Sequence, residues 1–245
     1  MNSIELQNVS KYFKVNGRRL KVVDGVSFRL EQGRSLALIG PSGCGKSTIL
    51  SMTAGFFPPD EGRISVSGSL GLCLQDDKLL PWRTVLKNAC LPGEIKGAEA
   101  LAEAKEKASA YLPLFGLDGF EDSYPAQLSG GMRQRAALLR TLIAGGDFML
   151  LDEPFARLDA LTKEDLHRLL HRVMERFSPG MLLITHDIEE ALKIADEICL
   201  LSPRPARVVE RLTTPKGEGM PFDPLKHAAL KQHMRDVLLA HKTPV

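Results

Sequence analysis

The fold is decided by Gly40-Pro41-Ser42-Gly43-Cys44-Gly45-Lys46-Ser47-Thr48. This stretch follows the apolar run 35–39 directly and precedes residues 49–54, whose composition predicts a helix. Strand, glycine-rich turn and helix in this order form the context in which the pattern G-x-x-x-x-G-K-[ST] makes a phosphate site. The glycines let backbone N–H groups approach an anion closely, and the helix start adds its positive end. We therefore expect an α/β fold in which Lys46 reaches the β- and γ-phosphates of a nucleotide and Ser47 ligates Mg²⁺.

The composition is typical of a soluble globular protein with a sizeable core. The 245 residues are 44% hydrophobic and 25% charged, which allows one large α/β domain or two small ones. A net charge of +2 is too mild to indicate a nucleic-acid partner. The four cysteines are scattered and are interpreted as isolated reduced thiols in a cytosolic protein. No window approaches about 18 uninterrupted apolar residues, so any action at a membrane is expected to go through a partner.

Two further apolar runs end in side chains suited to chemistry. Residues 147–152 predict a buried parallel strand, and it ends in Asp152 and Glu153. Open α/β sheets bind ligands at the carboxyl ends of their strands, so two carboxylates there favour metal and water chemistry. The run 181–185 predicts another strand of this kind, and it ends at His186.

Three other places allow more than one interpretation. Tyr12 and Phe13 could stack on a purine or simply cover a sheet. Ser129 is a plausible N-cap, and the glycines after it make this helix start a second candidate anion contact. The loop around Trp82 is apolar without any periodicity, so it either marks a protein contact or packs on the following helix.

The remaining pattern gives the domain organisation. A hairpin around Asn16-Gly17 opens the chain, and residues 97–115 predict an amphipathic helix. We expect one domain over residues 1–212 and a helical tail over 213–245. Within the domain, a catalytic core (1–80 and 146–212) is expected to carry a helical insertion (81–145).

Taken together, these motifs resemble the ATP-binding cassette (ABC) ATPases over nearly the whole chain, to about Leu212. The matching positions are the Walker A loop Gly40 to Thr48, the Q-loop glutamine Gln75, the signature Leu128-Ser129-Gly130-Gly131, the Walker B strand and following glutamate Phe148 to Glu153, the D-loop end Leu158-Asp159 and the switch histidine His186. The resemblance implies a P-loop NTPase fold. It has a RecA-like core, an antiparallel β subdomain and an inserted α-helical subdomain.

The resemblance also implies residue roles. ATP is expected to contact Phe13, Gly40, Pro41, Ser42, Gly43, Cys44, Gly45, Lys46, Ser47, Thr48 and Gln75. Mg²⁺ is expected at Ser47, Gln75 and Asp152, and the catalytic groups are expected to be Glu153, His186 and Lys46. Two copies would face each other head to tail. Ser129, Gly130, Gly131 and Met132 would then reach the nucleotide of the other copy, and Asp159 would lie at the dimer seam.

Four stretches are similar to the nitrate, sulfonate and taurine importer branch of the family: Leu80 to Val85, Leu128 to Arg135 with Met132 replacing the usual glutamine, Asp159 to Thr162, and Leu201 to Pro205. That branch implies an energy-coupling subunit, docked on permease subunits at the cytoplasmic face of the membrane. It also implies a separate solute-binding protein and no nucleic-acid partner.

The residues Ala156-Arg157 depart from the branch, which usually has Gly-Ala there. Alternatives are an importer of a thiamine-precursor pyrimidine or another small solute, a soluble non-transport ABC ATPase, and a regulatory module without turnover.

Overall fold

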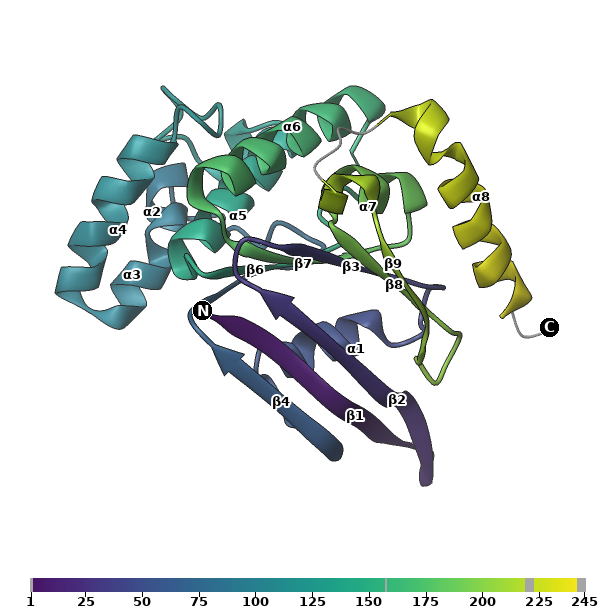
Figure 1. Ribbon diagram of the computed structural model, residues 1–245. Helices are drawn as coiled ribbons and strands as arrows, with labels where there is room; N and C mark the ends of the chain where they lie inside the picture. The colour runs from purple at the N-terminus through teal and green to yellow at the C-terminus, as the bar shows by residue number, and fades with distance from the viewer. Residues whose placement is uncertain (1, 157, 219–222, 242–245) are drawn as a thin grey trace. The chain divides into compact units, whose positions relative to one another are not determined.

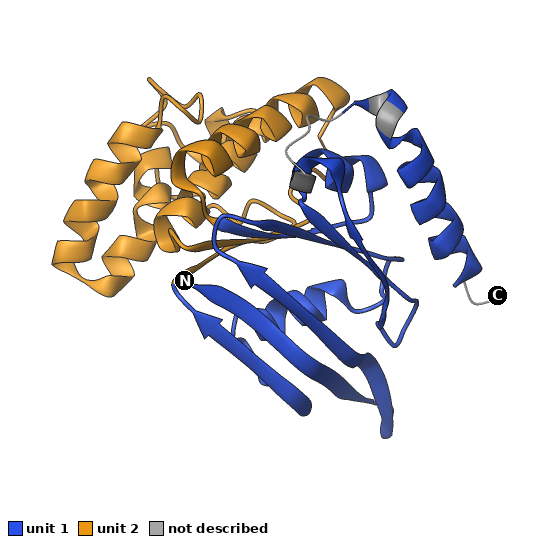
Figure 2. Ribbon diagram, viewed as in Figure 1, with its two compact units in different colours: residues 1–68, 180–245 blue, residues 69–179 orange. Residues whose placement is uncertain are grey.

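The computed structural model describes residues 2–156, 158–218 and 223–241. Arg157, the departure noted above, lies outside the described residues. By its internal contacts the chain divides into two compact units: unit 1 is residues 1–68 and 180–245, and unit 2 is residues 69–179 (Figure 2). Among the described residues, no helix is both long and apolar enough to cross a membrane.

Unit 1 begins with a three-stranded antiparallel sheet in the order β2-β1-β4 (Figure 1). Its strands are β1 (Ser3–Val15), β2 (Arg18–Glu31) and β4 (Glu61–Ser67). Asn16 and Gly17 join β1 to β2 with φ angles of 50° and 76°, as a type I′ turn requires. The hairpin predicted around these two residues is confirmed.

The other strands of unit 1 run parallel, apart from the last. They are β3 (Ser35–Ile39), β7 (Gly180–Thr185), β8 (Glu197–Leu201) and β9 (Val208–Thr213). β3 pairs in parallel with both β7 and β8, and β9 pairs antiparallel with β8. Every residue of β3 and β7 is buried, which explains why both read as continuous apolar runs in the sequence.

The described residues of unit 1 also form the helices α1 (Lys46–Thr53), α7 (Ile188–Ile194) and α8 (Pro224–Ala240) and the 3₁₀ turn η2 (Pro215–Glu218). α7 packs against β3, β7 and α8. The predicted tail helix is confirmed as α8, which begins at Asp223 as N-cap and buries Met234 completely. Its Lys231 pairs at 2.8 Å with Glu189 of α7.

Unit 2 contains a parallel pair of strands, β5 (Leu70–Cys73) and β6 (Phe148–Asp152). Its helices are α2 (Val85–Ala89), α3 (Leu91–Lys96), α4 (Ala98–Tyr111), η1 (Pro125–Gln127), α5 (Gly130–Ala144) and α6 (Ala160–Phe177). Glycines let α5 lie directly on β5. A Cβ atom at Gly71 would lie 1.9 Å from the carbonyl oxygen of Thr141, and one at Gly145 would lie 2.1 Å from the carbonyl carbon of Leu70.

The helix predicted over residues 97–115 ends four residues early, at Tyr111. Pro113 explains the early end, because it offers no backbone N–H to continue the helical hydrogen bonds. Leu112 and Phe115 nevertheless stay buried and complete the apolar face of α4. All the helices from α2 to α5 lie within the predicted insertion 81–145, whose status as a separate subdomain stays a prediction.

Candidate active site

The predicted phosphate loop lies in unit 1, between β3 and α1. Gly43 has a φ of 72° and Gly45 a φ of 130°, a region that residues with side chains rarely adopt. A Cβ atom at Gly45 would also lie 2.9 Å from the carbonyl oxygen of Val22 in β2. Glycine at position 45 is therefore required by its backbone angle and by the close approach of β2.

Lys46 is the first residue of α1 and is only 5% exposed. Its Nζ donates hydrogen bonds to the carbonyl oxygens of Gly40, at 2.8 Å, and Pro41, at 3.1 Å. A buried ammonium held inside its own loop fits an anionic ligand, because phosphate oxygens would offer it stronger, charged acceptors. The arrangement can bind a polyphosphate.

The other loop residues divide by exposure. Cys44 is buried, and burial raises the pKa of its thiol, so the side chain contributes packing as a neutral group. Ser42 and Ser47 are exposed. The loop thus presents hydroxyl groups outward, while Cys44 and Lys46 anchor it inside.

His186 follows β7 in unit 1 and is exposed. Asp187, the next residue, is the N-cap of α7, and its carboxylate accepts hydrogen bonds from the backbone N–H groups of Glu189 and Glu190. His186 therefore stands at the carboxyl end of a buried parallel strand, where the sequence places it.

The structure separates the two aromatic candidates at the end of β1. The ring of Tyr12 lies under the guanidinium of Arg19, at 3.8 Å from its centroid, and its hydroxyl donates to Glu61. Phe13 is 38% exposed and meets Phe57 edge to face, with ring centroids 6.0 Å apart. Phe13 is thus the better ring for stacking on a base.

Unit 2 carries the two acids at the end of β6. Asp152, the last residue of the strand, is 9% exposed. Glu153 has a φ of 44°, an uncommon conformation for a residue with a side chain. Gln75, which follows β5 closely, places its side-chain Nε2 at 3.4 Å from a carboxylate oxygen of Glu153. The structure therefore brings Gln75 and Glu153 together, as adjacent parallel strands predict.

The signature residues start α5. Ser129 is its N-cap and accepts a hydrogen bond from the backbone N–H of Met132 at 3.2 Å, so the predicted cap is confirmed. A Cβ atom at Gly131 would lie 2.5 Å from the methyl group of Thr162, near the start of α6. Asp159 caps α6 and accepts a bond from the Thr162 hydroxyl at 2.6 Å, which is the main reason that the pKa of this carboxyl is lowered. The signature and the D-loop end thus meet at Gly131 and Thr162.

Trp82 is 70% exposed, which favours the protein-contact interpretation of its loop. The loop around it is nonetheless firmly held. The buried side chain of Asn88 bonds the backbone of Leu80 in both directions, at 2.7 and 3.1 Å, and Arg83 makes a two-pronged ion pair with Glu94. Beside Trp82 lies a cavity of about 600 Å³, lined by Leu86, Leu101 and Lys105 among others.

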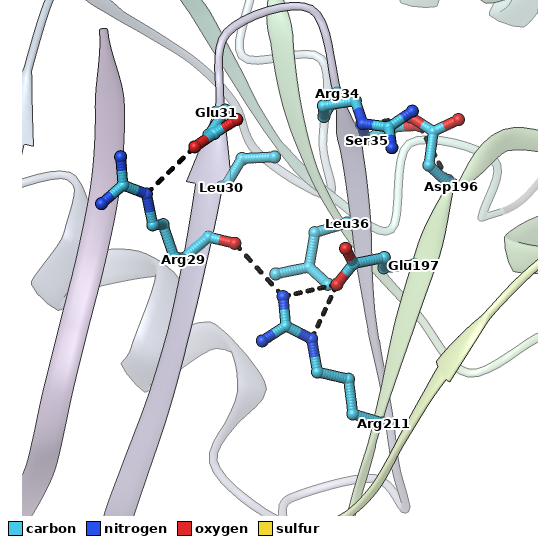
Figure 3. Close-up of a pocket in the computed structure, with 9 residues that line it drawn as sticks. All are labelled: Arg29, Leu30, Glu31, Arg34, Ser35, Leu36, Asp196, Glu197 and Arg211. Carbon is cyan, nitrogen blue, oxygen red and sulfur yellow. Dashed lines mark hydrogen bonds and ion pairs between the residues drawn. The ribbon is translucent and has the colours of Figure 1, made fainter. Parts of the chain in front are cut away.

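A second cavity, of about 370 Å³, lies at the amino end of β3, the end away from the phosphate loop (Figure 3). Its charged groups bond to one another: Arg211 pairs with Glu197, and Arg29 with Glu31. The carboxylate of Asp196 accepts from both the backbone N–H and the hydroxyl of Ser35, at 2.7 and 2.8 Å. These bonds tie the starts of β3 and β8 together.

Sequence reasoning missed three residues that support the candidate site. Phe57 meets Phe13, Asn88 holds the loop of Trp82, and Arg204 donates two hydrogen bonds to the carbonyl oxygen of Gly43. Arg204 lies in the stretch Leu201 to Pro205 quoted above, but nothing in that stretch points to Gly43, and Phe57 and Asn88 belong to no quoted motif. Only the three-dimensional contacts identify them.

Comparison with known proteins assigns the class. Residues 23–156, more than half of the chain, match the family model described as ABC transporter. The chain belongs to this family, and its fold is the α/β fold of the ABC ATPases. It is an ATP-binding protein and an ATPase.

Individual relatives agree with that class. The taurine import ATP-binding protein TauB of Pseudomonas aeruginosa is 41% identical, with 86% of this chain and 83% of the relative covered. An uncharacterised ABC transporter ATP-binding protein of Methanocaldococcus jannaschii is 39% identical over 84% of this chain and 80% of its own length. Among solved structures, the dimeric bacterial ABC transporter cassette MJ0796 is similar with a TM-score of 0.75 and 28% identity, covering 86% of this chain and 98% of that one. The same cassette has been solved after hydrolysis, bound to ADP and Pi.

Proposed function

We propose that the chain is the energy-coupling subunit of an ABC importer and that ATP binds to the phosphate loop of unit 1. The observation that carries the nucleotide site is Lys46, a buried ammonium inside a glycine loop whose backbone angles favour glycine. Residues 40–48 cradle the phosphates, and Phe13 stacks on the adenine. His186 contacts the γ-phosphate.

The residues expected to hold Mg²⁺ are Ser47, Gln75 and Asp152, whose hydroxyl, amide and carboxylate oxygens are the hard ligands that this ion prefers. When bound, Mg²⁺ neutralises charge on the β- and γ-phosphate oxygens. Glu153 polarises the attacking water, and its 3.4 Å approach to Gln75 orients the carboxylate. Phosphoryl transfer needs little covalent help, so positioning and charge neutralisation supply most of the acceleration.

The proposed active form is a head-to-tail dimer. The dimeric cassette named above supports it, as do Ser129 and Gly131 at the start of a helix of 15 residues. In the dimer, Ser129 to Met132 contact the γ-phosphate held by the other copy, and Asp159 lies at the seam. ATP closes the dimer because only its γ-phosphate bridges the two surfaces, and hydrolysis reopens it.

The proposed partners are permease subunits in the membrane and a separate solute-binding protein. The chain would then lie at the cytoplasmic face, with segment 81–145 as the helical subdomain that docks and the rest of residues 1–212 as the catalytic core. The names of relatives such as TauB and the sulfonate import protein SsuB of Bacillus cereus support a small sulfonate as the solute. Ligand screening of the binding protein encoded with this chain would test that choice against nitrate and the pyrimidines.

Trp82→Ala tests the docking. Because Trp82 is 70% exposed on a loop fixed by Asn88, its removal should leave the loop in place. We expect ATP binding by the isolated protein to stay within about twofold and permease association to weaken about tenfold or more, as for an aromatic hot spot. Co-purification and titration with the permease would measure the effect. Phe56→Ala, which removes an exposed ring outside segment 81–145, is the matched control; an undisturbed Trp82→Ala complex would contradict the docking role.

A further inference from the structure

The side chain of Arg204 contacts the phosphate loop at the exposed residue Gly43. Its Nη2 donates a hydrogen bond to the carbonyl oxygen of Gly43 at 2.7 Å, and its Nε donates another to the same oxygen at 3.1 Å. The two residues are 161 positions apart in the chain, and both belong to unit 1. The guanidinium of Arg204, in the turn between β8 and β9, thus hydrogen-bonds to the middle of the phosphate loop.

That turn is itself well fixed. The Ser202 hydroxyl bonds the carbonyl oxygen of Pro205 at 2.8 Å and accepts from the backbone N–H of Arg207 at 3.0 Å. The backbone of Ala206 pairs with β2, donating to the carbonyl of Val22 and accepting from the N–H of Asp24, both at 2.9 Å. β2 is also the strand that approaches Gly45. Strand β2 therefore holds the turn that carries Arg204 and also packs against the phosphate loop.

The hydrogen bonds from Arg204 fix Gly43, a residue whose backbone rotation is otherwise little restricted. Gly43, with its φ of 72°, has no side chain to limit its rotation. The peptide unit that joins it to Cys44 is held at both polar ends, since the Cys44 N–H donates to the carbonyl of Pro41 at 3.2 Å and Arg204 holds the Gly43 oxygen. Fixing this peptide before a ligand arrives lowers the ordering cost of binding.

The same side chain adds charge. The guanidinium of Arg204 carries a positive charge and lies beside the proposed anion site. The phosphate loop therefore has two positive charges next to its backbone, the Lys46 ammonium within it and the Arg204 guanidinium bound to Gly43. A fixed positive field of this kind favours ligands in proportion to their negative charge.

We propose that Arg204 is a positioning residue of the phosphate loop. It holds the Gly43 peptide in its binding conformation and strengthens the loop's selection for nucleoside di- and triphosphates. The proposal rests on the proposed function, namely that residues 40–48 bind the phosphates of ATP.

The experiment compares Arg204→Met, Arg204→Lys and the matched control Arg207→Met. Arg207 lies in the same turn, but its ion pair goes to Asp24 and not to the loop. Dissociation constants are measured for ATP, ADP and inorganic tripolyphosphate, together with the KM and kcat of ATP hydrolysis and the Tm of each variant.

Arg204→Met should raise the dissociation constants of ATP, ADP and tripolyphosphate about fivefold to tenfold, the effect of one charge-assisted bond that solvent partly screens. KM should rise with them, while kcat at saturating ATP stays within about twofold, because the catalytic groups are untouched. Arg204→Lys keeps the positive charge but cannot donate two hydrogen bonds to the Gly43 oxygen in the same geometry. Its dissociation constants should lie between those of the unaltered protein and those of Arg204→Met. Arg207→Met should bind all three ligands as the unaltered protein does.

Equal weakening by Arg207→Met would overturn the proposal, because the effect would then come from the turn as a whole. Unchanged binding of tripolyphosphate by Arg204→Met would overturn it too. If Lys46→Ala binds ATP normally, the phosphate-loop assignment itself fails. If Lys46→Ala loses ATP while Arg204→Met does not, only the inference about Arg204 fails.

Discussion

Glu153→Gln is expected to lower ATP turnover about 100-fold or more while ATP binding stays within a few-fold, since loss of a general base typically has this size. Glutamine has nearly the same shape as glutamate, so it can occupy the same place after β6 and keep its approach to Gln75. What it lacks is the negative charge that polarises the water in the proposed mechanism. Without hydrolysis, the γ-phosphate persists, and closed dimers should accumulate in Mg-ATP.

Phosphate release and light scattering after size-exclusion chromatography measure the two parts of this prediction. Glu106→Gln is a suitable control, because it removes an exposed carboxylate of α4 in the same unit. Unchanged turnover in Glu153→Gln would refute the assigned role. Lost turnover with only monomers in ATP would refute the proposal that ATP closes a dimer.

Lys46→Ala should weaken ATP binding about 100-fold or more. Hydrogen bonds to charged groups contribute about 1.5 to 3 kcal/mol each, and in the proposed site two phosphates would share this ammonium. The change also removes the bonds that Lys46 donates to the carbonyls of Gly40 and Pro41. Calorimetric titration with ATP would measure the loss.

The Tm of Lys46→Ala separates a binding defect from a folding defect. The bond to the Gly40 carbonyl is buried, so the change leaves an acceptor without its donor, and we expect a lowered Tm with the protein still folded at the temperature of the titration. Lys14→Ala, an exposed lysine of β1, controls for the change in net charge. Normal ATP affinity in a folded Lys46→Ala protein would remove the phosphate-loop assignment.

The sequence predicted the fold class because its strongest signals are local. A buried strand, a glycine loop and a helix stand next to one another around Gly43, and the caps Ser129, Asp187 and Asp223 each lie within three residues of the N–H groups that they accept. These features depend on spacing along the chain, and the structure confirms them. The catalytic roles of Glu153 and His186 stay predictions until the variants are measured.

Contacts between distant residues could not be predicted in the same way. Arg204 reaches Gly43 from 161 positions away, and one arginine in a turn looks like any other until the turn is folded. The family resemblance named Phe13 as the stacking ring, but the contact that covers the alternative ring of Tyr12, made by Arg19, appears only in the structure. Such outcomes follow from the rotamers and neighbours of particular side chains, for which the sequence has no periodic signal.

The close approach of α5 to β5 has a consequence for protein engineering. Gly71 and Gly145 leave no space between the strand and the helix, so these two segments have to be inherited as a pair. A chimera whose crossover falls between residues 74 and 140 would combine a strand and a helix from different parents, and one methyl group at position 71 would force them apart. Exchange of the short segment 79–84 avoids this conflict, which makes it the practical graft for testing the proposed permease contact.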